Sequence, residues 1–214
     1  ALLQTSGEIH AFAISDVHNG WQNGLGIIRS SSQEIGRNYW INVSGYTMSV
    51  DEDSIGSSYD GTSKNLWIGS DIHETESYIL GLAAGFSSSE VDTTSSGSSD
   101  TNTVSLAAYL RGQHGALEYN GILSVNRSEI DTKRTVDLST GSLRNTSSST
   151  ATGAALSAQL GYRYDLKPET ISSLVWVRGD VSTNSTSTFT EKGSSVTALK
   201  VSGENVHTTD VSLG

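Results

Sequence analysis

A strict two-residue alternation runs through residues 77–90, SYILGLAAGFSSSE, and it constrains the fold more than any other feature of the chain. Successive side chains of a β-strand point to opposite faces, so this stretch places one apolar row on a single face. That row includes Tyr78, Leu80, Leu82 and Phe86. The opposite face is small rather than charged, and it includes Gly81, Ala83 and Gly85. Such a strand suits a sheet that needs an apolar environment on one side and clearance on the other.

The same period of two continues through most of the chain after residue 36. We expect strands at 39–50, 62–74, 77–89, 102–111, 116–127, 152–164 and 170–181, and an eighth that begins near Thr208 and runs to the last residue. Several have about ten residues or more, which is long for a globular sheet but suits a tilted strand that crosses a membrane. The strand lengths therefore favour a membrane protein.

The connections between these strands alternate between long and short. The long ones are DEDSIGSSYDG, SEVDTTSSGSSDT, the stretch from SEIDTKR to RNTSSS, and STNSTSTFTEKGSS, and the short ones are ETE, GQHG and DLKPE. Barrels of the outer-membrane type have short turns at one end and longer loops at the other. The sequence therefore predicts an all-β fold, an antiparallel up-and-down transmembrane β-barrel formed by residues 37–214.

Residues 1–36 differ from the rest and predict a helix. Thr5 and Glu8 have the spacing of a capping box, in which each side chain binds a backbone N–H of the first turn. Apolar side chains then recur at helical spacing, among them Ile9, Phe12, Val17 and Trp21. Three glycines between residues 20 and 26 weaken the helix. We therefore expect it to need an enclosing partner, which the lumen of the barrel would provide.

In such a barrel, one face of each strand contacts lipid and the other lines the lumen. We expect a lipid-facing set that includes Tyr78, Leu80, Leu82, Phe86, Leu106, Leu123, Leu156, Leu160 and Tyr162. We expect a lumen-facing set of small or polar side chains that includes Gly81, Ala83, Gly85, Ser105, Glu118, Asn120, Asn126, Ser157 and Arg163. The small members would give clearance for the helix. For the charged and amide members, contact with the helix or a passing chain and ordinary hydration both stay open.

Composition excludes several classes of protein. A net charge of −10 disfavours a nucleic-acid binder, which needs a clustered basic surface. Without cysteine there is no disulfide framework and no thiolate metal site. No run of about 18 apolar residues predicts a transmembrane helix. The N-terminus, ALLQTSGEIHAF, does not read as a signal peptide, so we expect a part of a longer chain.

No motif predicts catalysis, a cofactor or a metal site. The sequence has neither G-x-S-x-G nor H-E-x-x-H. Two histidines, His10 and His18, lie eight residues apart on one side of the predicted helix. They could bind a ligand or line the pore, and lining the pore is the favoured interpretation. The stretch DEDSIGSSYDGT departs from a calcium loop because Ile55 and Thr62 occupy ligand positions. We expect a solvated loop there.

Several segments resemble the translocator (β) domain of monomeric, type Va autotransporters. They are TSGEIHA, LGLAAGFSSSEVD, VSLAAYLRGQHGALEYNGILSVNRSEID, LSAQLGYRYDLKPETISSLVWVRGDVS and FTEKGSSVTAL, in this order along nearly the whole chain. The LGYRYDLKPE and EKGSSVTAL stretches are also similar to β-domains that carry esterase passengers. Some members of this family release the passenger by cleavage at an Asn-Asn pair in the helix, and because this sequence has no such pair, the resemblance implies no self-cleavage there. The resemblance implies a twelve-stranded barrel, of which this chain contains about the first seven to eight strands.

The resemblance also implies the partners of the chain. Residues 1–36 would be a linker helix that threads the pore and joins the barrel, 37–214, to a passenger domain at the cell surface. The barrel would lie in the Gram-negative outer membrane with its long loops extracellular. Its partners would be outer-membrane lipid, its own passenger, the barrel-assembly machinery and periplasmic chaperones. A sheet of seven to eight strands leaves two open edges, so further strands of the chain or another polypeptide would complete the wall.

A second function stays open at this point. Alternation by itself also fits a soluble, Ser/Thr-rich β-domain that acts as a surface adhesin or a structural module. The apolar face of the strands discriminates between the two, because it would be covered by a core in a soluble domain and would meet lipid in a barrel.

Overall fold

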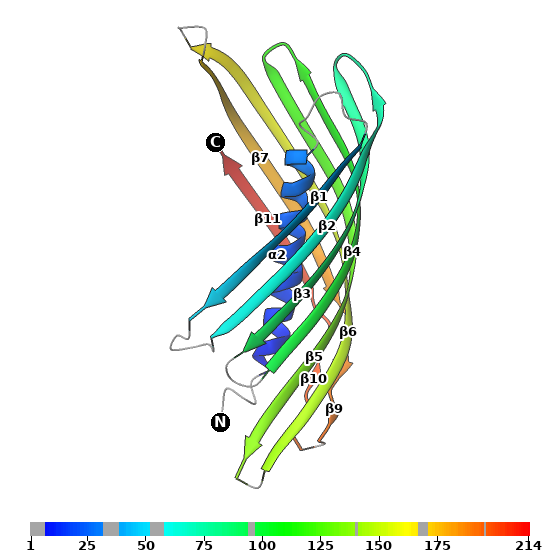
Figure 1. Ribbon diagram of the computed structural model, residues 1–214, viewed down its shortest axis with the longest axis vertical. Helices are drawn as coiled ribbons and strands as arrows, with labels where there is room; N and C mark the ends of the chain where they lie inside the picture. Colours follow the sequence, from blue (N-terminus) through cyan, green and yellow to red (C-terminus); the bar gives the residue numbers. More distant parts are fainter. Residues whose placement is uncertain are drawn as a thin grey trace.

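One helix lies along the concave side of a long, curved antiparallel sheet (Figure 1). This computed structural model describes residues 7–31, 39–51, 58–93, 97–139, 141–166, 171–194 and 196–214. The helix is α2 (Glu8–Ser31), and within the described residues it is not apolar enough to cross a membrane. Thr5 of the predicted capping box and most of the acidic loop after Asp51 lie outside the described residues.

The main sheet has an up-and-down topology in which neighbours in sequence are neighbours in space. Its path is β1 (Tyr39–Val50), β2 (Tyr59–Glu74), β3 (Tyr78–Thr93), β4 (Gly97–His114), β5 (Leu117–Leu138), β6 (Gly141–Leu166), β7 (Ile171–Thr186) and β11 (Asn205–Leu213). Three short strands, β8 (Phe189–Thr190), β9 (Lys192–Gly193) and β10 (Lys200–Val201), lie between β7 and β11. The predicted antiparallel β fold with an N-terminal helix is confirmed. Within the described residues the sheet ends at β1 and β11 and is not closed.

The predicted long loops were wrong in three places, because many of their residues are paired strands. In the last predicted loop, β7 continues to Thr186 and two short paired strands follow it. The stretch predicted as the longest loop forms the ends of β5 and β6, which pair without interruption from Leu117↔Tyr162 to Leu138↔Gly141. Much of the connection predicted after residue 89 likewise extends β3 and β4. The many Ser, Thr and Asp residues suggested loops there. In the structure, however, every second side chain still points inward and most of these are buried, as Ile130 and Val136 are. The strands are longer than predicted because backbone pairing and the burial of inward-facing side chains continue beyond the point where the outer face becomes polar.

Other boundaries differ by a few residues. β2 begins at Tyr59 rather than at residue 62, and β11 begins at Asn205 rather than near Thr208. The helix continues through its three glycines as far as Ser31. It does so because its buried face packs on the sheet along its whole length, which outweighs the low helix propensity of glycine.

The outer face of the sheet changes character along the strands. In β5 the outward side chains are apolar through Leu123 and Val125, and they become charged from Arg127 to Lys133. In β3 they are apolar as far as Phe86 and include Glu90 beyond it. We call the apolar part the outer band and the paired ends of β3, β4, β5 and β6 beyond it the extended hairpins. The N-terminus of α2 lies at the end of the molecule where the extended hairpins project (Figure 1).

Candidate functional site

The C-terminal half of α2 packs on inward-facing aromatic side chains of the sheet. Trp21, Leu25 and Ile28 of the helix are buried in one cluster with Trp40, Trp67 and Tyr109. The Trp21 Nε1–H donates a hydrogen bond of 2.9 Å to Ser124 Oγ. Gly24 permits the Trp67 ring to approach the helix backbone, since a Cβ at this position would lie 2.6 Å from Cζ2 of Trp67.

The small residues of β3 accommodate these aromatic rings. A Cβ at Gly85 would lie 2.4 Å from Cε2 of Trp67, and one at Gly81 would lie 2.0 Å from Cζ of Tyr109. Both distances are far below a normal carbon–carbon contact of about 3.5–4.0 Å. The role predicted for these glycines therefore needs correction. Their clearance is used by rings from neighbouring strands, which in turn pack against the helix.

Two polar clusters lie on the inner face near the C-terminal half of α2. Tyr109 donates to Asp71 Oδ1 at 2.6 Å and accepts a hydrogen bond of 3.1 Å from Trp40 Nε1. In the second cluster, Arg29 Nη2 donates to Ser157 Oγ at 2.9 Å and lies 3.6 Å from Asp180 Oδ1. Arg29 lies in the last turn of the helix, where a cation also complements the helix dipole. The helix is thus tied to β6 and β7 by a charge as well as by apolar packing.

The N-terminal half of α2 packs on the extended hairpins. Ala13 and Val17 are buried against Ile130 of β5 and Ala151 of β6. Asp16 is buried and accepts hydrogen bonds from Ser89 and from Tyr46, the latter at 3.4 Å. The Phe12 ring lies 4.3 Å from that of Tyr59, centroid to centroid. Contacts to the sheet therefore extend along the full helix.

A buried carboxylate lies beside the first turn of the helix. Glu191, in the segment between β8 and β9, is only 5% exposed. Arg134 of β5 binds it with two nitrogens, Nε to Oε1 at 3.0 Å and Nη2 to Oε2 at 2.6 Å. The Leu199 backbone N–H donates to Oε2 at 2.9 Å, and His10 Nε2 lies 3.0 Å from Oε1. These four contacts, from three residues, use the hydrogen-bonding capacity of a carboxylate.

The hydrogen bonds of this cluster define its charges. Burial by itself would raise the pKa of Glu191, but hydrogen bonds from Arg134, the Leu199 N–H and His10 hold it below its ordinary value. Burial lowers the pKa of His10, which lies beyond the outer band, despite its bond to Glu191. A neutral imidazole that donates from Nε2 and accepts at Nδ1 satisfies both Glu191 and the Thr132 hydroxyl 3.3 Å away. The cluster is then a balanced pair of one carboxylate and one guanidinium.

The sequence model of the autotransporter β-domain family matches residues 39–214, which include every strand of the described sheet. The chain belongs to the autotransporter β-domain family. It is an outer-membrane translocator domain that serves the secretion of a passenger domain in Gram-negative bacteria.

Two solved translocator domains share the fold. The translocator domain of autotransporter NalP from Neisseria meningitidis has a TM-score of 0.70 and 17% identity, covering 92% of this chain and 68% of that one. The β-domain of the Bordetella autotransporter BrkA has a TM-score of 0.55 and 18% identity, covering 84% of this chain and 70% of that one. No curated protein matches the sequence.

The translocator domain brings most of the predicted lumen-facing residues to the concave side. Buried there are Gly81, Ala83, Gly85, Ser105, Asn126 and Ser157, and Asn120 is half-buried. Glu118 and Arg163 share that face but pair with each other, Nε to Oε1 at 2.6 Å, in an exposed position close to the β4–β5 turn. Of the helix residues, Ile9, Val17 and Trp21 are buried, while Glu8 and Phe12 are half-buried.

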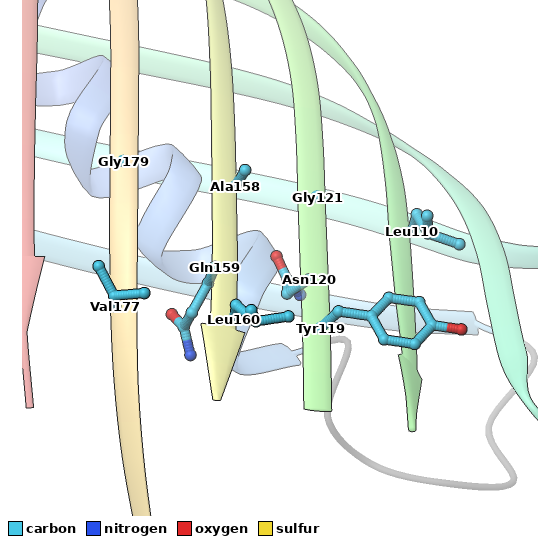
Figure 2. Close-up of a pocket in the computed structure, with 9 residues that line it drawn as sticks. All are labelled: Leu110, Tyr119, Asn120, Gly121, Ala158, Gln159, Leu160, Val177 and Gly179. Carbon is cyan, nitrogen blue, oxygen red and sulfur yellow. The ribbon is translucent and has the colours of Figure 1, made fainter. Parts of the chain in front are cut away.

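The predicted lipid-facing residues lie on the convex side. Exposed there are Leu80, Leu82, Phe86, Leu106, Leu123, Leu156, Leu160 and Tyr162, and Tyr78 is half-buried. A shallow hollow of about 410 Å³ lies on this side, where Leu110, Tyr119, Leu160 and Val177 surround the small residues Gly121, Ala158 and Gly179 (Figure 2). Its lining is mostly apolar, and its polar members are Tyr119, Asn120 and Gln159.

Sequence reasoning missed the buried charged residues that bind the helix, Asp180 and Glu191, and Arg134, which binds Glu191. Asp180, Arg134 and Glu191 were not singled out, although alternation within the predicted strand 170–181 would have assigned Asp180 to the inner face. Arg134 lies in a stretch that the sequence predicted as a loop. Glu191 carries no such signal, because it lies in a polar segment outside the main sheet. Among the described residues no three potential metal ligands cluster, and only His10 of the two helix histidines joins the Glu191 cluster.

Proposed function

We propose that residues 1–36 are the linker of the translocator domain and that residues 37–214 contribute its wall. The helix occupies the pore with its N-terminus toward the cell surface, and the extended hairpins are extracellular. The observation that carries this proposal is the helix on the small, polar concave side of a sheet whose convex side is apolar. A passenger attached before the helix would then leave the pore at the extended hairpins.

The outer band supports contact with lipid. Tyr78 and Phe86 are eight residues apart, a span of about 26 Å along a strand. At a tilt near 40° this span covers about 20 Å of depth, somewhat less than the apolar band of about 25 Å in outer-membrane barrels. The soluble alternative would leave this band without a cover, because the helix lies on the other face.

The charged outer surface beyond the band supports the orientation. Arg127, Glu129 and Lys133 face outward on β5 and are exposed. Charged side chains on the lipid face of a barrel are costly, so this part of the wall belongs in water. Outer-membrane barrels have short periplasmic turns and longer extracellular parts, which assigns the short turns near Ser77 and Gly115 to the periplasm.

Two further aspects of the proposal concern partners and chemistry. Strand edges such as those of β1 and β11 must be paired in a membrane, so we expect assembly by the barrel-assembly machinery, with periplasmic chaperones before it. We also propose that the domain acts as anchor and conduit without catalysing a reaction or holding a cofactor. Ester hydrolysis by the domain itself would contradict this.

Cysteine labelling in intact cells tests the orientation, since the chain has no cysteine of its own. Ser139→Cys lies at the β5–β6 hairpin and His114→Cys at the β4–β5 turn, and both positions are exposed. We expect a membrane-impermeant maleimide to label Ser139→Cys from outside and His114→Cys only after the outer membrane is opened. The reverse pattern would refute the proposed orientation, and labelling of both without opening would refute a membrane-embedded wall.

A further inference from the structure

The segment between β7 and β11 crosses back over the N-terminal end of α2. We call its described residues, 187–194 and 196–204, the strap. Within the strap, β8 pairs with β10, so it forms a small ribbon of its own. A polar connection of this length would be expected to extend into water, yet Glu191 at its centre is nearly fully buried.

One set of contacts ties the strap to the wall. β9 pairs with β6 at Asn145 and Thr146. The Asn145 side chain donates to Thr197 Oγ1 at 2.9 Å and accepts from the Ser194 N–H at 3.0 Å. Arg134 Nη2 also donates to the Thr197 carbonyl at 2.7 Å. These contacts belong to the barrel alone and need no helix.

A second set of contacts ties the strap to the helix. His10 Nε2 binds the Glu191 carboxylate, and the His10 ring meets Phe189 edge-on with centroids 4.9 Å apart. Leu199 packs over Gly7, where a Cβ would lie 3.0 Å from Leu199 Cδ1 and where φ is +74°. A side chain at residue 7 would be strained and would also press on the strap. The strap thus forms a binding site for the first turn of the helix, which we call the seat and which consists of Phe189, Glu191 and Leu199.

We propose that the strap is a latch that closes on the linker helix when export ends and then holds the helix in the pore. This inference rests on the proposed function, because it assumes that a passenger passes through the lumen before the helix arrives. While an unfolded passenger segment occupies the mouth of the pore, His10 and Gly7 are absent from the seat. Glu191 and Phe189 then lack their helix partners, and the closed strap is less stable.

The latch follows from the reciprocity of coupled equilibria. Whatever free energy the helix contributes to closing the strap, the closed strap contributes equally to retaining the helix. The Glu191 carboxylate links the two sets of contacts, since it binds Arg134 of the wall and His10 of the helix at once. The Leu199–Gly7 contact adds a second link that involves no charge.

The labelling rate of a cysteine at a buried helix position measures how often the helix leaves its seat. Ala13 is 1% exposed, and Ala13→Cys is a small change there. In the complete protein in cells, we expect Glu191→Gln to raise the rate of external maleimide labelling of Ala13→Cys roughly tenfold, the effect of losing hydrogen bonds to a charged group. Leu199→Ala should raise it several-fold while leaving the charges in place. Glu129→Gln, on the outer face of β5, is the matched control and should not change it.

A surface epitope placed before the helix reports export in the same cells. An exposed epitope, with faster labelling in Glu191→Gln and Leu199→Ala but not in Glu129→Gln, supports the latch. An exposed epitope with labelling unchanged in Leu199→Ala overturns the latch and leaves the proposed function standing, even if Glu191→Gln fails to assemble. An epitope that is never exposed in the unsubstituted protein refutes both proposals.

Discussion

Replacing Gly85 with alanine should destabilise the translocator domain although alanine is the smallest possible addition. The Trp67 indole lies between two glycines, Gly85 of β3 on one side and Gly24 of the helix on the other. A Cβ at Gly85 would lie 2.4, 2.5 and 2.6 Å from three atoms of the ring. Because a relaxed carbon–carbon contact needs about 3.5–4.0 Å, the ring would have to move by about 1 Å toward the helix.

The helix leaves no room for that movement. Trp67 is 3% exposed, and a Cβ at Gly24 would itself lie 2.6 Å from the ring. Overpacking of this kind costs about 1–3 kcal/mol. Alanine regains about 0.5–1 kcal/mol by restricting the unfolded chain. The two ranges give a net loss of up to about 2.5 kcal/mol, centred on about 1 kcal/mol, in the free energy of unfolding.

Urea unfolding of the complete translocator domain in lipid vesicles measures this difference, with the free energy extrapolated linearly to water. Gly179→Ala is the control, because a Cβ there would have no neighbour within 4 Å. In a Trp67→Leu background, Gly85→Ala should lose most of its cost. If Gly85→Ala is as stable as Gly179→Ala, the close packing of Trp67 between sheet and helix is wrong.

Three further predictions concern the membrane face, the helix and the strap. Leu82→Arg, near the middle of the outer band, should cost about 2–4 kcal/mol in the same urea assay, whereas Glu90→Arg, beyond the band on the same strand, should cost little. Trp21→Phe removes the hydrogen bond to Ser124. Its cost in the free energy of unfolding should be about 1 kcal/mol greater when Ser124 is present than when Ser124 is replaced by alanine. Strap closure should weaken as the pH falls, since His10 and Glu191 both have pKa values below their ordinary values of 6.5 and 4.5. Protonating His10 or Glu191 therefore favours the open strap, and the nearby Arg134 charge acts on His10 in the same direction. The rate of Ala13→Cys labelling, divided by that of Ser139→Cys, should rise below about pH 6.5 and rise further below about pH 4.5. A ratio that stays flat down to pH 4 would contradict this.

The faces of the strands were predictable from the sequence because alternation is a local rule. Leu82 and Ala83 are adjacent in sequence and must point to opposite sides of any regular strand. Burial then separates them as expected, since Leu82 is 51% exposed and Ala83 is 5% exposed. The helix was predictable for the same reason, because its apolar residues recur at the helical period. Strand ends were not, because the polar hairpin residues carry no signal that distinguishes a loop from a strand paired to its neighbour.

What the sequence by itself determined is the antiparallel order of the sheet, its two faces and the presence of a helix before it, since each depends on residues close together in the chain. Only the tertiary structure decided which side chains fill the space that the small residues leave. Trp67 lies against Gly24 and Gly85, and Glu191 meets His10 across 181 positions of sequence separation. Such contacts depend on the curvature of the whole sheet around the helix, which no local period of the sequence encodes.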